Sequence, residues 1–176
     1  MAFAFLNKFF GEAAADPRDA WKPLYAACIA EGRKPHWYLQ GQVPDSIDGR
    51  FDMLTLIVSV ALIRLEQIGD EGPQATAFIT ELLVEDMEGQ VREIGFGDLV
   101  VGKHVGLMMG AFGGRLGAYR DALRGGENLA EAITRNLYRG EPVAADALDH
   151  VVKEVTALHT AQASLSLEAM RSGQVR

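Results

Sequence analysis

The sequence has little cysteine, no long apolar run and no excess of positive charge, and each shortage excludes a class of protein or site. Cys28 is the only cysteine in 176 residues, which excludes an internal disulfide and a four-cysteine zinc site. The net charge of −7 argues against a nucleic-acid partner, because phosphate binding rests on clustered lysine and arginine. The longest internal apolar run, residues 53–65, contains polar side chains and falls short of the roughly 20 residues that cross a bilayer.

The first ten residues are apolar and aromatic, and two interpretations of them stay open. Their rings dock on the core of the protein, or they reach a membrane interface or a partner. The sequence favours core docking and keeps a peripheral membrane contact through residues 1–10 as the alternative. We therefore separate an N-terminal apolar segment, residues 1–12, from a single all-α domain, residues 13–176, since a chain of this length fits one domain.

Proline and glycine divide the rest of the chain into helical segments, and no stretch shows the alternation of a β-strand. The expected boundaries lie near 17–32, 49–69, 73–87, 98–124, 128–140 and 142–170, with a short aromatic piece at 36–38. The middle of 49–69 is apolar on nearly every side, so we expect it at the centre of a bundle. The prediction is an all-α fold, a compact single-domain bundle of about seven or eight helices.

Glycine recurs at every fourth position of the segment 98–124, at Gly102, Gly106, Gly110 and Gly114. In a helix this spacing forms one slowly drifting stripe without side chains. Each glycine costs the helix roughly 0.5–1 kcal/mol relative to alanine, so we expect a compensating interaction. We favour a close crossing of another helix inside the fold. The alternatives are a groove for the helix of a partner and a helix break at Gly113–Gly114.

The sequence offers little that suggests catalysis. None of the four histidines follows a glutamate by three residues, so the di-iron bundle signature is absent; they are His36, His104, His150 and His159. Cys28 lies on the apolar face of its helix and is expected to be a small buried side chain. Asp86 and Glu88 fit a solvated helix end better than an acid–base pair. We predict no enzyme, no cofactor and no metal site.

Three stretches, taken in order and spacing, carry a resemblance to a known family. The first joins His36-Trp37-Tyr38 to residues 43–54, the second covers residues 85–99, and the third covers residues 111–119. Together they resemble the ubiquinol–cytochrome c chaperone family, which are assembly factors of the cytochrome bc complex, respiratory complex III. The resemblance extends over about residues 20–140, which is most of the chain.

The resemblance implies an all-α, non-enzymatic protein that binds newly made cytochrome b and helps it acquire haem and enter the complex. The mitochondrial members carry a targeting segment that this sequence lacks, so the chain is similar to a bacterial member. Such a member is expected on the cytoplasmic face of the inner membrane. The oligomeric state and the need for a second assembly partner stay open.

A chaperone for a membrane protein needs an apolar patch with a charged rim. The candidate client-binding residues are Trp37, Tyr38, Asp45, Arg50, Phe51, Asp52, Asp86, Glu88, Arg92, Asp98, Arg115 and Tyr119. As alternatives, Phe51 belongs to the core and Arg50 pairs with an acidic residue such as Asp86. The polar cluster of residues 86–98 is expected to meet the Lys- and Arg-rich cytoplasmic loops of cytochrome b.

Two other function classes remain as alternatives. The first is a helical carrier of haem or another hydrophobic cofactor, with a cavity lined by Met108, Met109 and His104. The second is an enzyme that uses Asp86 or His104, which requires a pocket that combines a carboxylate with a histidine.

Overall fold

All regular elements of the computed structural model are helices, over the residues that it describes, 16–93, 95 and 97–176. The elements are η2 (Pro17–Trp21), α1 (Lys22–Gly32), α2 (Pro35–Leu39), α3 (Ile47–Leu65), α4 (Gly72–Glu93), α5 (Asp98–Leu123), α6 (Leu129–Asn136), α7 (Ala145–Ala163) and α8 (Leu167–Arg171). This confirms the predicted all-α bundle of seven or eight helices. None of the described helices combines the length and the apolarity needed to cross a membrane. The predictions for residues 1–12 concern a segment outside the described residues.

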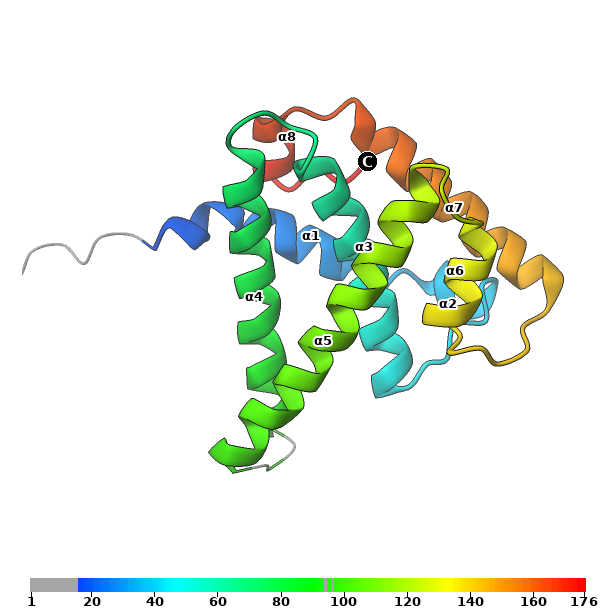
Figure 1. Cartoon of the computed structure of the whole chain (residues 1–176), viewed down its shortest axis with the longest axis horizontal. Helices are drawn as coiled ribbons and strands as arrows, with labels where there is room; N and C mark the ends of the chain where they lie inside the picture. Colours follow the sequence, from blue (N-terminus) through cyan, green and yellow to red (C-terminus); the bar gives the residue numbers. More distant parts are fainter. Residues whose placement is uncertain (1–15, 94, 96) are drawn as a thin grey trace, which may run out of the picture.

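Helix α3 forms the centre of the bundle, as its sequence predicts. Every residue from Leu56 to Ile63 is 0% exposed. Helices α1, α4, α5 and α7 all contact α3, and Figure 1 shows it enclosed among them. The buried hydroxyls of Thr55 and Ser59 donate to carbonyl oxygens of α3 itself, at 2.8 and 2.6 Å. A helix that is apolar on all sides is stable only when others cover it, so α3 fixes the places of its neighbours.

Several helix ends follow from capping residues in the sequence. The Asn128 side chain accepts hydrogen bonds from the backbone N–H groups of Ala130 and Glu131 and so caps the start of α6, at the boundary expected near residue 128. Helix α5 begins at Asp98, and Gly97 occupies the N-cap position before it. The long helix expected over 142–170 is two helices, because a second cap at Ser166 starts α8.

The glycine stripe lies on the solvent side of α5 among the described residues, and the predicted close crossing by another described helix is wrong. Gly102, Gly106, Gly110 and Gly114 are exposed, and a Cβ atom added at any of them meets no atom of the described structure within 4 Å beyond the local helix backbone. Helix α5 packs through its other side, which carries the buried residues Val101, Val105, Phe112 and Tyr119. The helix also continues without a break through Gly113–Gly114.

One pair of histidines connects α2 to α7. His36 Nδ1 lies 3.1 Å from His150 Nε2, and the two rings meet edge to face. Burial lowers the pKa of His36, which favours the neutral imidazole that such a hydrogen bond needs. The sequence gives no signal for this pair, because 114 positions separate the two residues.

The solvent position of the stripe makes a stability prediction. Gly106→Ala and Gly110→Ala should each raise the free energy of unfolding by roughly 0.5–1 kcal/mol, because alanine restricts the unfolded chain and meets no clash in the helix. Gly41→Ala is the opposite control, since its Cβ would lie 2.5 Å from the Trp37 carbonyl oxygen. Urea unfolding of the three variants measures both effects. Destabilisation by Gly106→Ala or Gly110→Ala would contradict the solvent position of the stripe.

Candidate functional site

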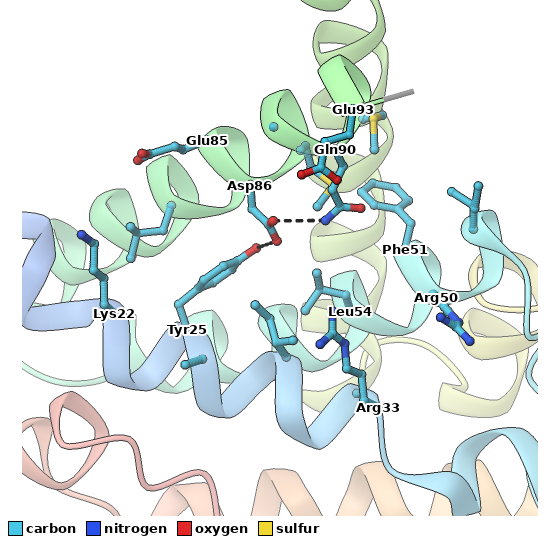
Figure 2. A pocket seen from close by; sticks show the side chains of 18 of the residues that line it. Lys22, Tyr25, Arg33, Arg50, Phe51, Leu54, Glu85, Asp86, Gln90 and Glu93 are labelled. Carbon is cyan, nitrogen blue, oxygen red and sulfur yellow. Dashed lines mark hydrogen bonds between the residues drawn. The ribbon is translucent and has the colours of Figure 1, made fainter. Parts of the chain in front are cut away.

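A groove of about 880 Å³ lies between α1 and α4, with the first turns of α3 and the middle of α5 behind it. Figure 2 shows α4 along its upper side and α1 along its lower side, and the two helices diverge toward the α3 end. The lining residues of α1 and of α4 recur at spacings of three and four. Such a spacing places them on one side of each helix. The groove therefore follows from two helix faces that do not pack fully against each other.

The floor of the groove is apolar. It contains side chains that are buried or half-buried, namely Ile29, Phe51, Leu54, Leu82, Met87 and Met108. At its edge lies Ile47, the first residue of α3, which is 73% exposed. Apolar surface that stays open to solvent beside charged residues is typical of binding sites.

The α4 side of the groove, which we call the acidic wall, carries Glu85, Asp86 and Glu93. Asp86 accepts hydrogen bonds from the Tyr25 hydroxyl at 2.8 Å and from Gln90 Nε2 at 3.1 Å, and Figure 2 shows both bonds. Burial, together with the hydrogen bond to Asp86, raises the pKa of Tyr25. The Tyr25–Asp86 bond therefore joins α1 to α4.

The opposite side, which we call the basic wall, carries Lys22 and Arg33 at the two ends of α1, and Arg50 of α3 extends it at the end of the groove near Phe51. Arg50 Nε lies 2.6 Å from Asp45 Oδ1 in an exposed pair, and this hydrogen bond lowers the pKa of Asp45. Arg50 thus pairs with an acidic residue, as the alternative expected, but its partner is Asp45 and not Asp86. Arg50 and Asp86 line the same groove, but each has another partner.

A buried ionic network beside the groove holds α3, α5 and the loop before α7 together. Asp52 is 1% exposed, and it lies 2.8 Å from Arg115 Nη2 and 2.6 Å from Arg139 Nε. The Arg115 guanidinium also stands over the Phe51 ring, 5.6 Å from its centroid. Through Arg115 the network thus contacts the ring of Phe51, which forms part of the groove floor.

Comparison with known proteins decides the family. The family model for the ubiquinol–cytochrome c chaperone matches residues 39–176, which is most of the chain. The chain belongs to the ubiquinol–cytochrome c chaperone family. The match takes in the parts of α3, α4 and α5 that line the groove, and it leaves α1 outside.

Relatives of this family member come from bacteria and animals. The crystal structure of the Cbp3 homolog from Brucella abortus is similar with a TM-score of 0.76 and 29% identity, over 89% of this chain and 87% of that chain. Ubiquinol-cytochrome c reductase complex assembly factor 1 of mouse is 25% identical and that of human 24% identical, each over 65% of this chain. The chain spans only 39% of the length of these two relatives.

Four predicted site residues lie together at the groove of this chaperone-family chain: Tyr38, Arg50, Phe51 and Asp86. The Tyr38 hydroxyl donates to the Gly32 carbonyl oxygen at 2.7 Å, which holds α2 against the end of α1. Phe51 is half-buried, so it belongs to the core and to the groove at once. Asp45 reaches this group only through its pair with Arg50.

Other predicted site residues lie inside the protein. Trp37 is 0% exposed and its indole N–H donates to the Glu31 carbonyl oxygen at 2.9 Å, so it cannot serve as an open aromatic anchor. Tyr119 is also 0% exposed, and burial raises the pKa of its hydroxyl. Asp52 and Arg115 neutralise each other in the buried network. These four side chains support the shape of the groove and do not line it.

The predicted polar cluster of residues 86–98 is divided between two sides of α4. Glu88 lines a separate cavity of about 370 Å³ with Arg18 and pairs with Arg92 at 3.8 Å, whereas Asp86 points into the groove. Asp86 and Glu88 point to different sides because residues two positions apart in sequence lie about 200° apart around the axis of a helix. The prediction for the side chain of Asp98 lies outside the described residues.

The arrangement expected for a cofactor carrier does not occur here. Of its three lining residues, Met108 lines the groove, whereas Met109 and His104 do not. His104 is exposed, with its Nδ1 3.3 Å from the Val100 carbonyl oxygen. The described lining of the groove contains carboxylates and no histidine, so the enzyme alternative lacks the pairing that it requires. Among the described residues no cluster of three His, Cys, Asp or Glu side chains can hold a metal ion.

Sequence reasoning missed most of the groove lining, including Lys22, Tyr25, Arg33, Ile47, Glu85 and Glu93. None of these six has a local pattern that separates it from an ordinary core or surface residue. Their only shared property is that α1, α3 and α4 bring them to one opening.

The network at Asp52 makes a second stability prediction. Asp52→Asn should lower the free energy of unfolding by about 3 kcal/mol, because it leaves the largely buried Arg115 without its counter-charge. Asp45→Asn is the control, since loss of an exposed ion pair costs at most about 1 kcal/mol. Guanidinium unfolding monitored by tryptophan fluorescence measures the difference. Equal effects of the two substitutions would show that the network contributes no more than a surface pair.

Proposed function

We propose that the chain is a non-enzymatic assembly chaperone that binds newly made cytochrome b and promotes assembly of the ubiquinol–cytochrome c reductase, the cytochrome bc complex. Membership of the chaperone family supports the general function. The names of the mouse and human relatives, which are complex assembly factors, support the reductase as the target. Because the chain spans only part of these relatives, cytochrome b as the client is part of the proposal.

The observation that carries the proposal is the open groove with its apolar floor and charged walls. A chaperone must cover an apolar segment of its client and must itself stay dissolved when it is empty. Here large apolar side chains such as Ile47, Phe51 and Met108 are accessible, and the charged residues around them limit association of the empty protein.

Charge supports a place at the cytoplasmic face of the inner membrane. Loops of bacterial membrane proteins on that face are rich in lysine and arginine. The chain has a net charge of −7, and its acidic wall lies beside the apolar floor. We include the peripheral membrane contact through residues 1–10 in the proposal, as the means by which the chaperone stays near a client that is being inserted.

Two exposed aliphatic residues offer a matched test. Ile47 is 73% exposed and lines the groove, whereas Leu39 is 72% exposed and does not line it. Ile47→Glu should reduce the cytochrome b recovered with the tagged chaperone about tenfold, since it removes an apolar contact and buries an unpaired carboxylate against the client, a loss of more than about 1 kcal/mol. Leu39→Glu should leave recovery unchanged. Immunoblots of solubilised membranes from the source organism measure both.

Circular dichroism and unfolding curves check that both variants fold. An equal loss of cytochrome b recovery in both variants would contradict a role of the groove. So would unchanged recovery in both. Absence of cytochrome b from the unchanged protein's complexes would contradict the proposed client itself.

A further inference from the structure

The two walls of the groove carry opposite charges in equal number. Glu85, Asp86 and Glu93 line the α4 side, and Lys22, Arg33 and Arg50 line the other side. Figure 2 shows the carboxylates of Glu85, Asp86 and Glu93 above the opening, and Lys22 and Arg33 below it. A segment with only positive charge is attracted by one wall and repelled by the other. A good fit therefore requires a basic edge toward α4 and an acidic edge toward α1.

Two of these six charges have no partner of their own within the described chain. Lys22 lies 2.6 Å from Asp19, Glu85 lies 3.2 Å from Arg18, Arg50 pairs with Asp45, and Asp86 holds Tyr25 and Gln90. The side chains of Arg33 and Glu93 form neither an ion pair nor a hydrogen bond with a described residue. Any segment that covers the groove removes water from both, and each then needs an opposite charge.

The form of the groove favours a helix as the bound segment. Its walls are helices, so they offer side chains and no free strand edge to pair with an extended peptide. The linings 22–33 and 82–93 each extend over about 16 Å, or roughly three helical turns. Above an apolar floor a bound backbone must satisfy its own hydrogen bonds, and a helix does so internally.

We propose that the groove binds one amphipathic helix of the client, with its apolar face on the floor, its basic edge along the acidic wall and its acidic edge along the basic wall. The identity of the protein that supplies the helix rests on the proposed function. The charge pattern of the helix rests on the groove alone. This differs from a client loop that carries only positive charge, which the sequence led us to expect.

Photo-crosslinking from uncharged groove positions tests the pattern. A photoreactive residue is placed at Ala26 on the α1 side, at Gln90 on the α4 side, and at the exposed Ala157 of α7 as a control. Peptide mapping of the captured client then identifies the segment. We expect the captures from Ala26 and Gln90 to map to one helix, with acidic residues at the Ala26 crosslink and basic residues at the Gln90 crosslink.

Charge reversal gives a second measurement. Arg33→Glu should lower capture from Ala26, and Glu93→Lys should lower capture from Gln90, each about tenfold. Lys153→Glu, on exposed surface of α7, is the matched control and should change neither. Capture that survives both groove reversals would overturn the proposed pattern.

The outcomes separate this inference from the proposed function. A helix of the expected pattern from cytochrome b supports both. The same pattern from another identified protein supports the inference and overturns cytochrome b as the client. A segment of cytochrome b with basic residues only, insensitive to Arg33→Glu, overturns the inference and leaves the client in place. Crosslinking yields from Ala26 and Gln90 that do not exceed the yield from Ala157 would overturn both the inference and the proposed function.

Discussion

The complete burial of α3 is the constraint on which the rest of the structure depends. A helix whose residues from Leu56 to Ile63 are all inaccessible needs neighbours on every side, and α1, α4, α5 and α7 provide them. The burial ends toward the start of α3, where Ile47, Phe51 and Leu54 come out between the diverging α1 and α4. The groove is the place where the covering of the central helix is incomplete.

The charges around the groove form two groups, a buried network around Asp52 and the exposed charges of the two walls. The buried carboxylate of Asp52 binds two arginines and ties α3 to α5 and to the loop before α7, so it maintains the shape of the floor. The exposed carboxylates and guanidinium groups on the walls meet water when the groove is empty. Because Asp52 is paired within the protein whereas the side chains of Arg33 and Glu93 are not, these two charges are the ones available to select a partner.

The fold was largely predictable from the sequence, because its determinants are local. The all-round apolarity of residues 56–63 indicates a central helix, and Asn128 identifies the start of α6. The glycine stripe of α5 misled, since helical spacing tells which residues share a face and does not tell which face is buried. The groove forms only where α1, α3 and α4 come together in the fold. Arg33 and Glu93 are therefore indistinguishable in the sequence from other surface charges. For the same reason the sequence placed Trp37 at a client surface, whereas the short helix α2 turns it into the core.

The amount of assembled cytochrome bc complex in a deletion strain of the source organism tests the central claim most directly. The b-type haem spectrum of its membranes reports this amount after complementation with the unchanged chain or with its Ile47→Glu variant. The account predicts that deletion removes most of the complex, that the unchanged chain restores it, and that the variant does not, although it accumulates to the same level. A normal spectrum in the deletion strain would contradict the chaperone function, and full restoration by Ile47→Glu would contradict the groove as its site.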